Sequence, residues 1–259
     1  MLVFTFGKKM PFGRWLLDLI FPRDCFVCQR PLDAQHPGFL CDSCFGQIVF
    51  PRGSVCSCCG RAMETESLGS NSGEISTDAS ARTWCCSNCV ELQPFFRQGI
   101  SLFAFTNVGR AFIHTLKYRH GTYLKKDLRR ILEHEKSRLL DLQGSTFVPV
   151  PLHFFRQWKR GYNQSEWIAK ALVACIGGKI APILRRNRFT PSQTSLTRSE
   201  RKQNVKGAFS LHMMKKVNPH AMYVLVDDVF TTGATLNACA QVLYEHGAQN
   251  IRVFTLAHG

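Results

Sequence analysis

The residues best suited to chemistry lie in the stretch from Tyr223 to Thr235, which reads YVLVDDVFTTGAT. An apolar, β-branched run ends there in two adjacent carboxylates, Asp227 and Asp228. The run has the length and composition of a buried parallel strand. A Thr/Gly-rich turn follows, and from Ala234 to Tyr244 the apolar residues have helical spacing. The sequence therefore predicts a strand, a tight turn and a helix, with both carboxylates at the carboxyl end of the strand.

The turn after this strand is suited to binding a phosphate group. Backbone N–H groups at a helix N-terminus have no partner within the helix, and the helix dipole favours an anion. A glycine in the turn lets the backbone approach the anion closely. The two carboxylates would accept hydrogen bonds from neighbouring hydroxyls of the same ligand, so a sugar phosphate satisfies both parts of the pattern. The predicted phosphate-binding residues are Thr231, Thr232, Gly233, Ala234 and Thr235.

Cys-x2-Cys pairs near the start of the chain predict two structural zinc sites. Each pair presents two thiolates to one cation, and two pairs complete a tetrahedral site. Because four thiolates leave no open position for a substrate, such a site stabilises the fold and does not catalyse. Gly60, directly after the third pair, suits a turn that needs a positive φ angle. The predicted ligands are Cys25, Cys28, Cys41 and Cys44 for the first site, and Cys56, Cys59, Cys86 and Cys89 for the second.

The same cysteines allow other metal assignments. Cys58 and Cys85 lie next to members of the second set, and each could replace its neighbour as a ligand. The pairs could also be interleaved, with the first and third pairs sharing one metal. An iron–sulfur cluster takes the same ligands, although paired Cys-x2-Cys turns are more typical of zinc. Such pairs in a chain without a secretory signal favour metal thiolates in a reducing, cytoplasmic environment over disulfides.

The positive charge of the chain is concentrated in its middle. The 259 residues carry a formal net charge of +15, and residues 110–216 contain 23 Lys and Arg against 6 Asp and Glu. Such a concentration favours a polyanionic partner, which could be a pyrophosphate, a nucleic acid or both. No run of 18 apolar residues occurs, so no membrane-spanning helix is expected.

Apolar runs alternate with helical patterns along the rest of the chain. This alternation favours a parallel sheet with right-handed crossovers, in which ligands bind beyond the carboxyl ends of the strands. The predicted fold class is therefore α/β, with a parallel-sheet domain preceded by a small Cys-rich zinc-ribbon module. We expect strands at 99–105, 145–150, 179–184 and 249–256, and helices from 110 onward, at 124–139 and at 163–176.

Three parts of the chain are predicted as separate units. Residues 1–21 mix charged and apolar side chains and are expected to form an N-terminal amphipathic segment. Residues 22–96 form the zinc-ribbon module, in which the Ser/Gly-rich stretch 62–83 is expected to be a mobile loop. Residues 97–259 form the α/β domain.

The stretch from Asp227 to Thr235 resembles the phosphoribosyl pyrophosphate (PRPP) loop of type I phosphoribosyltransferases. Further motifs extend the resemblance in a fixed order along the chain. They are the two cysteine sets, KYRHG at 117–121, VPVPLH at 148–153, RGYNQS at 160–165 and VLVDDVFTTGAT at 224–235. Together they resemble the ComF family, also described as GntX-like, over residues 22–257. The resemblance implies a type I phosphoribosyltransferase fold for the α/β domain, with an N-terminal double zinc ribbon.

The resemblance also implies roles for individual residues. In type I phosphoribosyltransferases the acidic pair holds the ribose hydroxyls and the turn holds the 5′-phosphate, which here makes Asp227 and Asp228 the catalytic candidates. Mg²⁺ accompanies PRPP in that family, and basic loops hold its pyrophosphate. The loop after strand 145–150 and the long loop at 185–206 occupy the corresponding places. Their candidate residues are Arg156, Lys159, Arg160, Arg198, Arg201 and Lys202.

Two functions follow from the resemblance. The ComF family is associated with natural competence, which implies a cytoplasmic protein that binds PRPP or a related sugar phosphate and handles incoming single-stranded DNA. A helicase or DNA-uptake protein would then be a partner. The alternative is an active phosphoribosyltransferase with an unidentified small-molecule acceptor unrelated to DNA. Aromatic residues among the basic loops could stack on bases, namely Phe154, Phe155, Trp158 and Tyr162.

Overall fold

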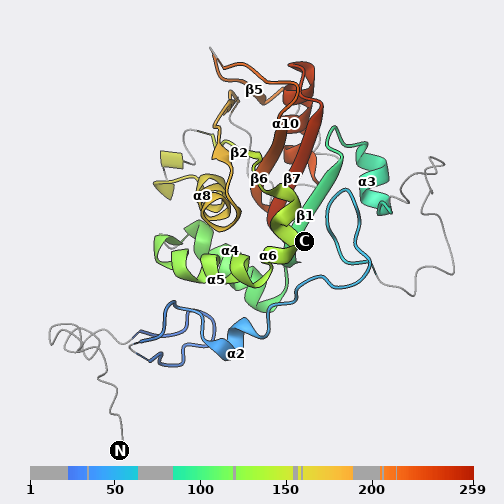
Figure 1. The fold of residues 1–259 in the computed structure, drawn as a ribbon. Coiled ribbons are helices and arrows are strands. Elements are labelled where there is room, and N and C mark those ends of the chain that lie inside the picture. Colours follow the sequence, from blue (N-terminus) through green and yellow to red (C-terminus); the bar gives the residue numbers. More distant parts are fainter. Residues whose placement is uncertain are drawn as a thin grey trace, which may run out of the picture.

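The computed structural model describes residues 23–33, 35–63, 84–118, 121–153, 157–158, 160–188, 205, 207–213 and 215–259. Its central sheet is parallel throughout, with the strand order β1-β7-β6-β2-β3 (Figure 1). The strand bounds are β1 Gln98–Ala104, β2 Thr146–Pro149, β3 Lys179–Ile180, β6 Met222–Phe230 and β7 Asn250–His258. The predicted parallel-sheet α/β class is confirmed.

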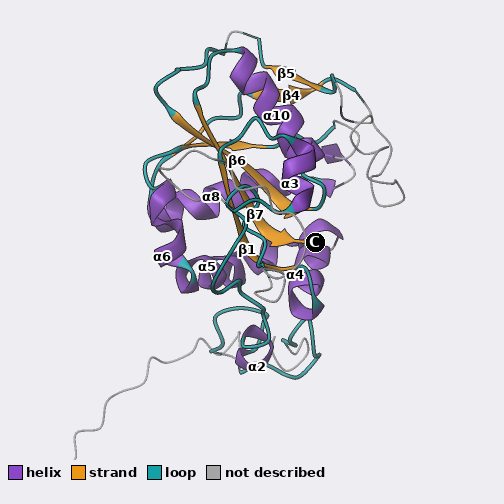
Figure 2. Cartoon of the chain, turned by 90° about the vertical axis from the view of Figure 1, so that its right-hand side faces the viewer, coloured by secondary structure: helices purple, strands orange, loops and turns teal. Residues whose placement is uncertain are grey.

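Helices pack on both faces of this sheet (Figure 2). Their bounds are α4 Asn107–Tyr118, α5 Lys125–His134, α6 Lys136–Leu139, α8 Gln164–Ile176 and α10 Ala234–Glu245, with 3₁₀ turns η2 Gly121–Leu124 and η3 Leu140–Leu142. Val224 and Val226 of β6 lie in one buried cluster with α4, α5 and α8, whereas Leu225 lies in a second cluster with α10. The continuous apolar run of β6 is thus buried on both faces, as expected of a central parallel strand.

One predicted strand is wrong in its extent. The stretch 179–184 was expected to be continuous, but only Lys179 and Ile180 join the main sheet. Pro182 follows, and proline has no N–H group to donate to a neighbouring strand. The chain then continues into a separate antiparallel pair, formed by β4 Leu184–Arg186 and β5 Phe209–Leu211.

The helix predicted at 124–139 is interrupted at Glu135. This residue has φ −102° and ψ 17° and separates α5 from α6. Its side chain is buried and accepts hydrogen bonds from the guanidinium groups of Arg52 and Arg138. The other predicted strands and helices of this domain lie within a few residues of their expected bounds.

The cysteine-rich part of the chain lies against the α/β domain at two places. Helix α2 Asp42–Phe45 is close to α4 and α5, and helix α3 Ser87–Leu92 is beside β1 (Figure 1). At the first of these places, aromatic rings of the cysteine-rich part pack against the α/β domain. The ring centroids of Phe26 and Phe112 lie 6.0 Å apart, and those of Phe39 and Tyr123 lie 4.9 Å apart.

Some predictions fall on residues outside the described part of the chain. These are the N-terminal segment 1–21 and most of the stretch 62–83. Among the described helices, none combines the length and the apolar character that crossing a membrane requires.

Candidate functional site

The acidic pair lies within β6 and not at its end. The sequence predicted that the strand stops at the carboxylates, but β6 continues to Phe230. The reason is the neighbouring strand β7, which pairs with Asp227 through Thr255 and with Phe230 through His258. The pair therefore sits near the carboxyl end of the strand, on backbone that sheet hydrogen bonds hold rigidly.

Asp228 is neutralised by a lysine from another motif. Its Oδ1 lies 3.0 Å from Nζ of Lys117, which is in the last turn of α4. Asp228 is 9% exposed, so the ion pair is largely shielded from water. A charge buried to this extent requires a partner or a ligand.

Asp227 has no lysine of its own and is held by neutral donors. Its Oδ1 accepts a hydrogen bond from Oγ of Ser165 at 3.1 Å and one from the N–H of Asp228 at 2.9 Å. Burial raises the pKa of Asp227 to about 7, and the charge of Asp228 adds to this rise, whereas these hydrogen bonds and the charge of Lys117 oppose it. Asp227 therefore changes its charge near neutral pH.

The RGYNQS motif places Ser165 beside the acidic pair. Asn163 caps α8, because its side-chain oxygen accepts a hydrogen bond from the N–H of Ser165 at 3.0 Å. Its Nδ2 donates to the carbonyl of Val150 at 3.0 Å, which ties the start of α8 to the segment after β2. These contacts orient the first turn of α8 toward β6.

Tyr162 of the same motif fixes the helix end that carries Lys117. Its hydroxyl donates to the carbonyl of Leu116 and accepts a hydrogen bond from the N–H of Gly121 at 3.1 Å. The ring packs against Trp167, with centroids 5.4 Å apart. In this structure Tyr162 thus supports the end of α4. Of the other aromatic residues predicted to stack on bases, Trp158 is 78% exposed, and Phe154 and Phe155 lie outside the described residues.

Lys117 and Ser165 are site residues that the sequence analysis did not single out. In the sequence they belong to the family motifs KYRHG and RGYNQS, which by themselves indicate no role for either residue. The sequence does contain a usable indication of Ser165, because residues that open a helix after a parallel strand lie at the ligand-binding edge of the sheet. Lys117 gives no comparable indication, since a lysine in the last turn of a helix is common on any protein surface.

The turn between β6 and α10 has the geometry that its glycine predicts. Gly233 has φ 75°, and a Cβ at this position would lie 2.5 Å from the ring of Phe230. Both the left-handed backbone and the lack of space exclude a side chain. The N–H of Ala234 donates to Oγ1 of Thr232 at 3.4 Å, a long hydrogen bond at the start of α10. The first turn of α10 is thus preceded by two threonines, of which Thr231 is exposed.

The predicted basic residues are described only in part. Arg160 donates to Oε1 of Gln164 at 3.1 Å and so lies at the start of α8. The other five candidates lie outside the described residues, namely Arg156, Lys159, Arg198, Arg201 and Lys202.

The first cysteine set has the arrangement of a tetrahedral metal site. The sulfur atoms of Cys25, Cys28, Cys41 and Cys44 all lie within 4.8 Å of one another, and those of Cys28 and Cys41 are 3.7 Å apart. A zinc–sulfur bond of about 2.3 Å gives an edge of about 3.8 Å in a tetrahedron. The residues therefore fit Zn²⁺ without rearrangement.

The second cysteine set has the same internal geometry. The sulfurs of Cys56, Cys59, Cys86 and Cys89 lie within 4.8 Å of one another, and those of Cys59 and Cys86 are 3.8 Å apart. Each set thus joins consecutive pairs, so the interleaved alternative is wrong. In the turns that carry Cys25 and Cys56, the residue four positions on has a positive φ, 58° at Gln29 and 73° at Gly60.

Cys58 and Cys85 remain close to the second set without replacing it. Their sulfurs are 2.7 Å apart, and with Cys56 they form a further group of thiols within 4.8 Å. A tetrahedral site needs four ligands, which the set of Cys56, Cys59, Cys86 and Cys89 already provides. We therefore take Cys58 and Cys85 as an adjacent pair of thiols.

The first ribbon, which carries Cys25, Cys28, Cys41 and Cys44, is anchored to the helices through its backbone. One carboxylate, that of Asp127 in α5, accepts hydrogen bonds from the N–H groups of Phe39 and Leu40 at 2.9 to 3.1 Å. Burial raises the pKa of Asp127, and these hydrogen bonds oppose the rise. Gly38 leaves the room for this contact, since a Cβ there would overlap the Asp127 carboxylate.

The second ribbon, which carries Cys56, Cys59, Cys86 and Cys89, is in contact with the turn between β6 and α10. The side chain of Leu92 in α3 lies so close to Gly233 that a Cβ on the glycine would be 2.7 Å from it. Asn237 in α10 accepts a hydrogen bond from the N–H of Phe95 at 2.8 Å. On β1, Oγ of Ser101 donates to the carbonyl of Cys59 at 2.6 Å. The metal-binding turn and the predicted ligand site therefore share one packed region.

Comparison with known proteins gives matches along nearly the whole chain. The chain is 30% identical over 243 residues to the DNA utilization protein YhgH of Salmonella typhimurium, covering 92% of this chain and 98% of that protein. It is 29% identical over 225 residues to the competence protein F of Haemophilus influenzae, covering 85% and 96%. It is 27% identical to the competence protein ComFC of Streptococcus pneumoniae, covering 78% and 86%.

Residues 16–90 match the family model described as a double zinc ribbon domain. The predicted structural zinc is supported by this match and by the geometry of the two cysteine sets. Among solved structures, a hypoxanthine phosphoribosyltransferase from Staphylococcus aureus matches 52% of this chain and 64% of its own, with 16% identity and a TM-score of 0.33. A purine phosphoribosyltransferase from Pyrococcus horikoshii matches 53% and 84%, with 11% identity and a TM-score of 0.30. Because both TM-scores are below 0.5, the assignment rests on the sequence relatives: the chain belongs to the ComF family of competence protein F and YhgH.

Proposed function

We propose that this protein binds PRPP or a related sugar phosphate at the turn after β6 and acts on single-stranded DNA during its uptake. The observation that carries the first part is the convergence of three separate motifs on one place. Lys117 from KYRHG and Ser165 from RGYNQS contact the two carboxylates of VLVDDVFTTGAT. Residues so distant in sequence gather around a strand end when they serve a ligand there.

Each part of the site would contact a different part of the sugar phosphate. The turn from Thr231 to Gly233 and the first N–H groups of α10 would hold the 5′-phosphate. Asp227 and Asp228 would accept hydrogen bonds from the ribose hydroxyls. Lys117, 3.0 Å from Asp228, would hold that carboxylate in position for the ribose hydroxyls.

Mg²⁺ is the metal that this type of ligand implies. It takes oxygen ligands and is often held by one or two carboxylates together with substrate phosphates. Asp227 and Asp228 fit this requirement, because both carry carboxylate oxygens and lie in β6, shortly before the turn. When bound, the ion would neutralise charge on a pyrophosphate group.

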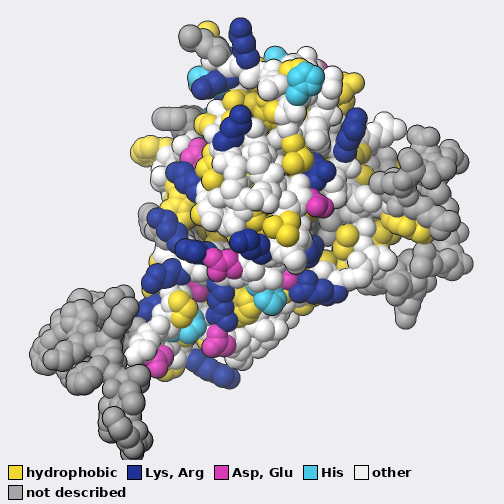
Figure 3. All heavy atoms as spheres, in the orientation of Figure 1, with side chains coloured by type: hydrophobic (Ala, Val, Ile, Leu, Met, Phe, Trp, Pro, Cys, Tyr) yellow, Lys and Arg dark blue, Asp and Glu magenta, His cyan; other side chains and the backbone are white. Residues whose placement is uncertain are grey.

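The link to DNA rests on the relatives and on the charge of the chain. Relatives at about 30% identity are named for competence and for DNA utilization. Lys and Arg side chains are spread over the face drawn in Figure 3, from the helices around α5 to the top of the molecule. The proposed location is the cytoplasm, and the proposed protein partners are a helicase or another DNA-uptake protein.

The sugar-phosphate proposal is tested with the double variant Asp227→Asn/Asp228→Asn. PRPP with Mg²⁺ should raise the unfolding temperature of the wild-type protein, because a ligand that binds only the folded state stabilises it, by about 2.7 kcal/mol at 100 times Kd. The double variant should lose this shift. The matched control Glu133→Gln/Glu245→Gln removes two exposed carboxylates elsewhere and should retain it. Equal shifts in all three proteins would refute the proposed site.

The DNA proposal is tested by fluorescence anisotropy with a labelled 30-mer. Three to six phosphate contacts predict a slope of log affinity against log salt of about −2 to −4. The variant Arg198→Ala/Arg201→Ala/Lys202→Ala should have a shallower slope. Absence of binding at low salt would contradict the role in DNA handling and would favour the alternative, a phosphoribosyltransferase with a small-molecule acceptor.

A further inference from the structure

A polar cavity lies at the end of the sheet opposite to the acidic pair. Its volume is about 660 Å³. It opens where β1, β6 and β7 begin, whereas Asp227 and Asp228 lie near the end of β6. Six residues along β6 correspond to roughly 20 Å, so the two places cannot share one small ligand. The side chains that matter here are those of Ser57, Arg97, Gln98, His220, Asn250 and Arg252.

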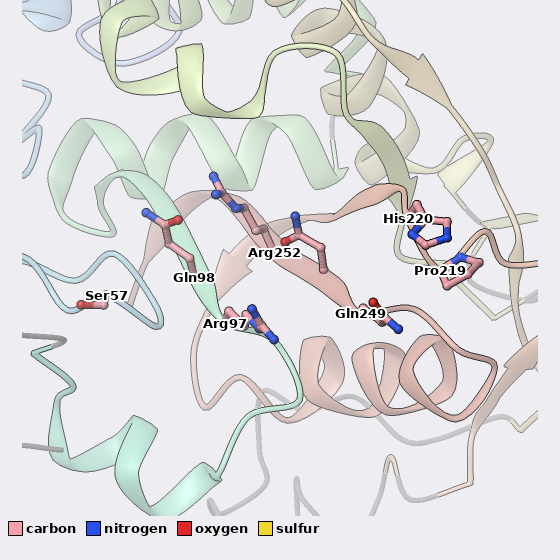
Figure 4. Close-up of a pocket in the computed structure, with 8 residues that line it drawn as sticks. Ser57, Arg97, Gln98, Pro219, His220, Gln249 and Arg252 are labelled. Atoms are coloured by element: carbon pink, nitrogen blue, oxygen red, sulfur yellow. The ribbon is translucent and has the colours of Figure 1, made fainter. Parts of the chain in front are cut away.

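Strand pairing sets the positions of these side chains. Gln98 of β1 is opposite Arg252 of β7, and the N–H of Arg97 donates to the carbonyl of Ile251 at 2.9 Å. Figure 4 shows the side chains of Gln98 and Arg252 next to each other, with His220 on the segment that leads into β6. Most of these polar groups therefore come from the starts of three paired strands or from the residues just before them.

The cavity is positively charged and lacks a compensating acid. No Asp or Glu is among the described residues that line it. Within the described residues, neither Arg97 nor Arg252 forms an ion pair, and the hydrogen bond that Arg252 donates through Nη1 goes to the neutral carbonyl of Asp141 at 3.2 Å. The side chains of Arg97 and Arg252 point to different sides of the paired strands (Figure 4), so each guanidinium, without a carboxylate partner, offers a separate contact to an anion at this cavity.

The second ribbon forms one wall of this cavity. Ser57 lies between the metal ligand Cys56 and Cys58, and its N–H donates to the carbonyl of Trp84 at 2.8 Å. Its carbonyl accepts a hydrogen bond from Gly99 at 2.9 Å, at the start of β1. The cavity is thus held open by the metal-binding turn on one side and by the sheet on the other.

We propose that this cavity is a second phosphate site, distinct from the turn after β6, which takes a phosphate group of a nucleotide or of a single DNA strand. Arginine matches phosphate because its planar guanidinium donates two parallel hydrogen bonds to neighbouring oxygens. The amides of Gln98 and Asn250 can donate and accept hydrogen bonds with the adjoining sugar or base. The volume lies within the range of sites that hold small molecules. These arginines lie outside residues 110–216, so their contribution is separable from that of the basic middle of the chain.

The test uses the full chain with Arg97→Gln/Arg252→Gln. The control Arg30→Gln/Lys136→Gln removes two positive charges from exposed positions away from the cavity. For a labelled dT30 strand, loss of two phosphate contacts should make the salt slope shallower by about 1.4, whereas the control should leave it unchanged. An unchanged slope in the cavity variant, together with unchanged nucleotide binding, overturns the proposal, and so does an equal change in both variants.

A second experiment, with a mononucleotide, identifies the source of the phosphate. Calorimetry with dTMP measures binding without a strand, and loss of dTMP binding in the cavity variant alone assigns the site to a nucleotide. Loss of dT30 affinity without dTMP binding assigns it to the strand. If the double variant unfolds in urea more readily than the wild type, Arg97→Gln is used alone, because Arg97 is exposed. The variant Asp227→Asn/Asp228→Asn should keep the dT30 slope of the wild type, so failure of the sugar-phosphate site and failure of the cavity are distinguishable.

Discussion

Replacing Asp227 by asparagine should stabilise the protein above neutral pH. The asparagine keeps the shape of the side chain, and its Oδ1 can still accept the hydrogen bonds from Ser165 and from the N–H of Asp228. What it removes is a carboxylate that burial and the neighbouring charge of Asp228 make costly to ionise. The substitution therefore isolates the electrostatic cost that a ligand-binding carboxylate imposes on the free protein.

The size and the pH window of this effect follow from the pKa of Asp227. That pKa is about 7 in the folded protein, against 3.8 for an ordinary aspartate. A folded-state pKa above the unfolded value gives stability that is fully present below pH 3.8 and is lost as the pH rises to 7. At about 1.4 kcal/mol per pH unit, the whole loss is at most about 4 kcal/mol. Between pH 6 and pH 7 alone, it is about 1 kcal/mol.

Urea unfolding at pH 6, 7 and 8 with saturating Zn²⁺ measures this difference. The free energy of unfolding of Asp227→Asn relative to wild type should increase by about 1 kcal/mol from pH 6 to pH 7 and change little from pH 7.5 to pH 8. Protonation of the cysteine ligands affects both proteins equally and cancels in the comparison. The difference therefore reports Asp227 alone.

The variant Asp228→Asn provides the opposite expectation. Asp228 is paired with Lys117 at 3.0 Å, so its removal leaves a partly buried lysine without a partner and should destabilise the protein by about 1 to 3 kcal/mol. Two neighbouring, chemically identical substitutions should thus differ in sign at pH 8. If Asp227→Asn destabilises the protein at pH 8, or if its difference from wild type is independent of pH, the electrostatic reasoning is refuted.

Further predictions concern the metal sites and the packing between the ribbons and the α/β domain. Freshly purified protein should contain about two Zn²⁺ per chain, and chelation should unfold the ribbons; elemental analysis that finds iron or no metal would contradict this. Glu135→Gln should lower the free energy of unfolding by about 2 to 4 kcal/mol, because Arg52 and Arg138 lose the buried carboxylate between them; urea unfolding that matches wild type would show that this bridge contributes nothing. Gly60→Ala should lower the yield of folded, zinc-loaded protein, because a Cβ there would overlap the backbone N–H of Ser101, and a normal zinc content would argue against this contact.

Local patterns were sufficient for the parallel sheet, the two cysteine sets and the glycine turn. Each of these depends on residues that are neighbours in sequence, such as the run Val224–Val226 or the pairs of cysteines. The break at Glu135 could not be foreseen in the same way, because no Pro or Gly marks it in the sequence and the side chain of Glu135 binds Arg52, 83 residues away. The strand end predicted at 227–228 is wrong for a similar reason, since pairing with β7 prolongs β6 to Phe230.

The candidate site shows the same limit. The carboxylates and the turn are adjacent in sequence and were recognised as one motif. Lys117 and Ser165 come from distant helices. Hydrogen bonds of Tyr162 and Asn163 position these helices next to the carboxylates, and the spacing of residues in the sequence does not predict such hydrogen bonds. The cavity between Arg97 and Arg252 depends in turn on the β1–β7 register.

That register has a consequence for how the protein is made. Within the described sheet, β1 pairs with β7 and with no other strand, and β7 is the last of the described elements in chain order. During synthesis, β1 must therefore wait for roughly 150 more residues, which take about 8 to 30 s at about 5 to 20 residues per second. Until then β1, the strand that contacts the second ribbon, has no partner strand. A nascent chain that stalls shortly before residue 250 should thus expose this ribbon to chaperones and proteases.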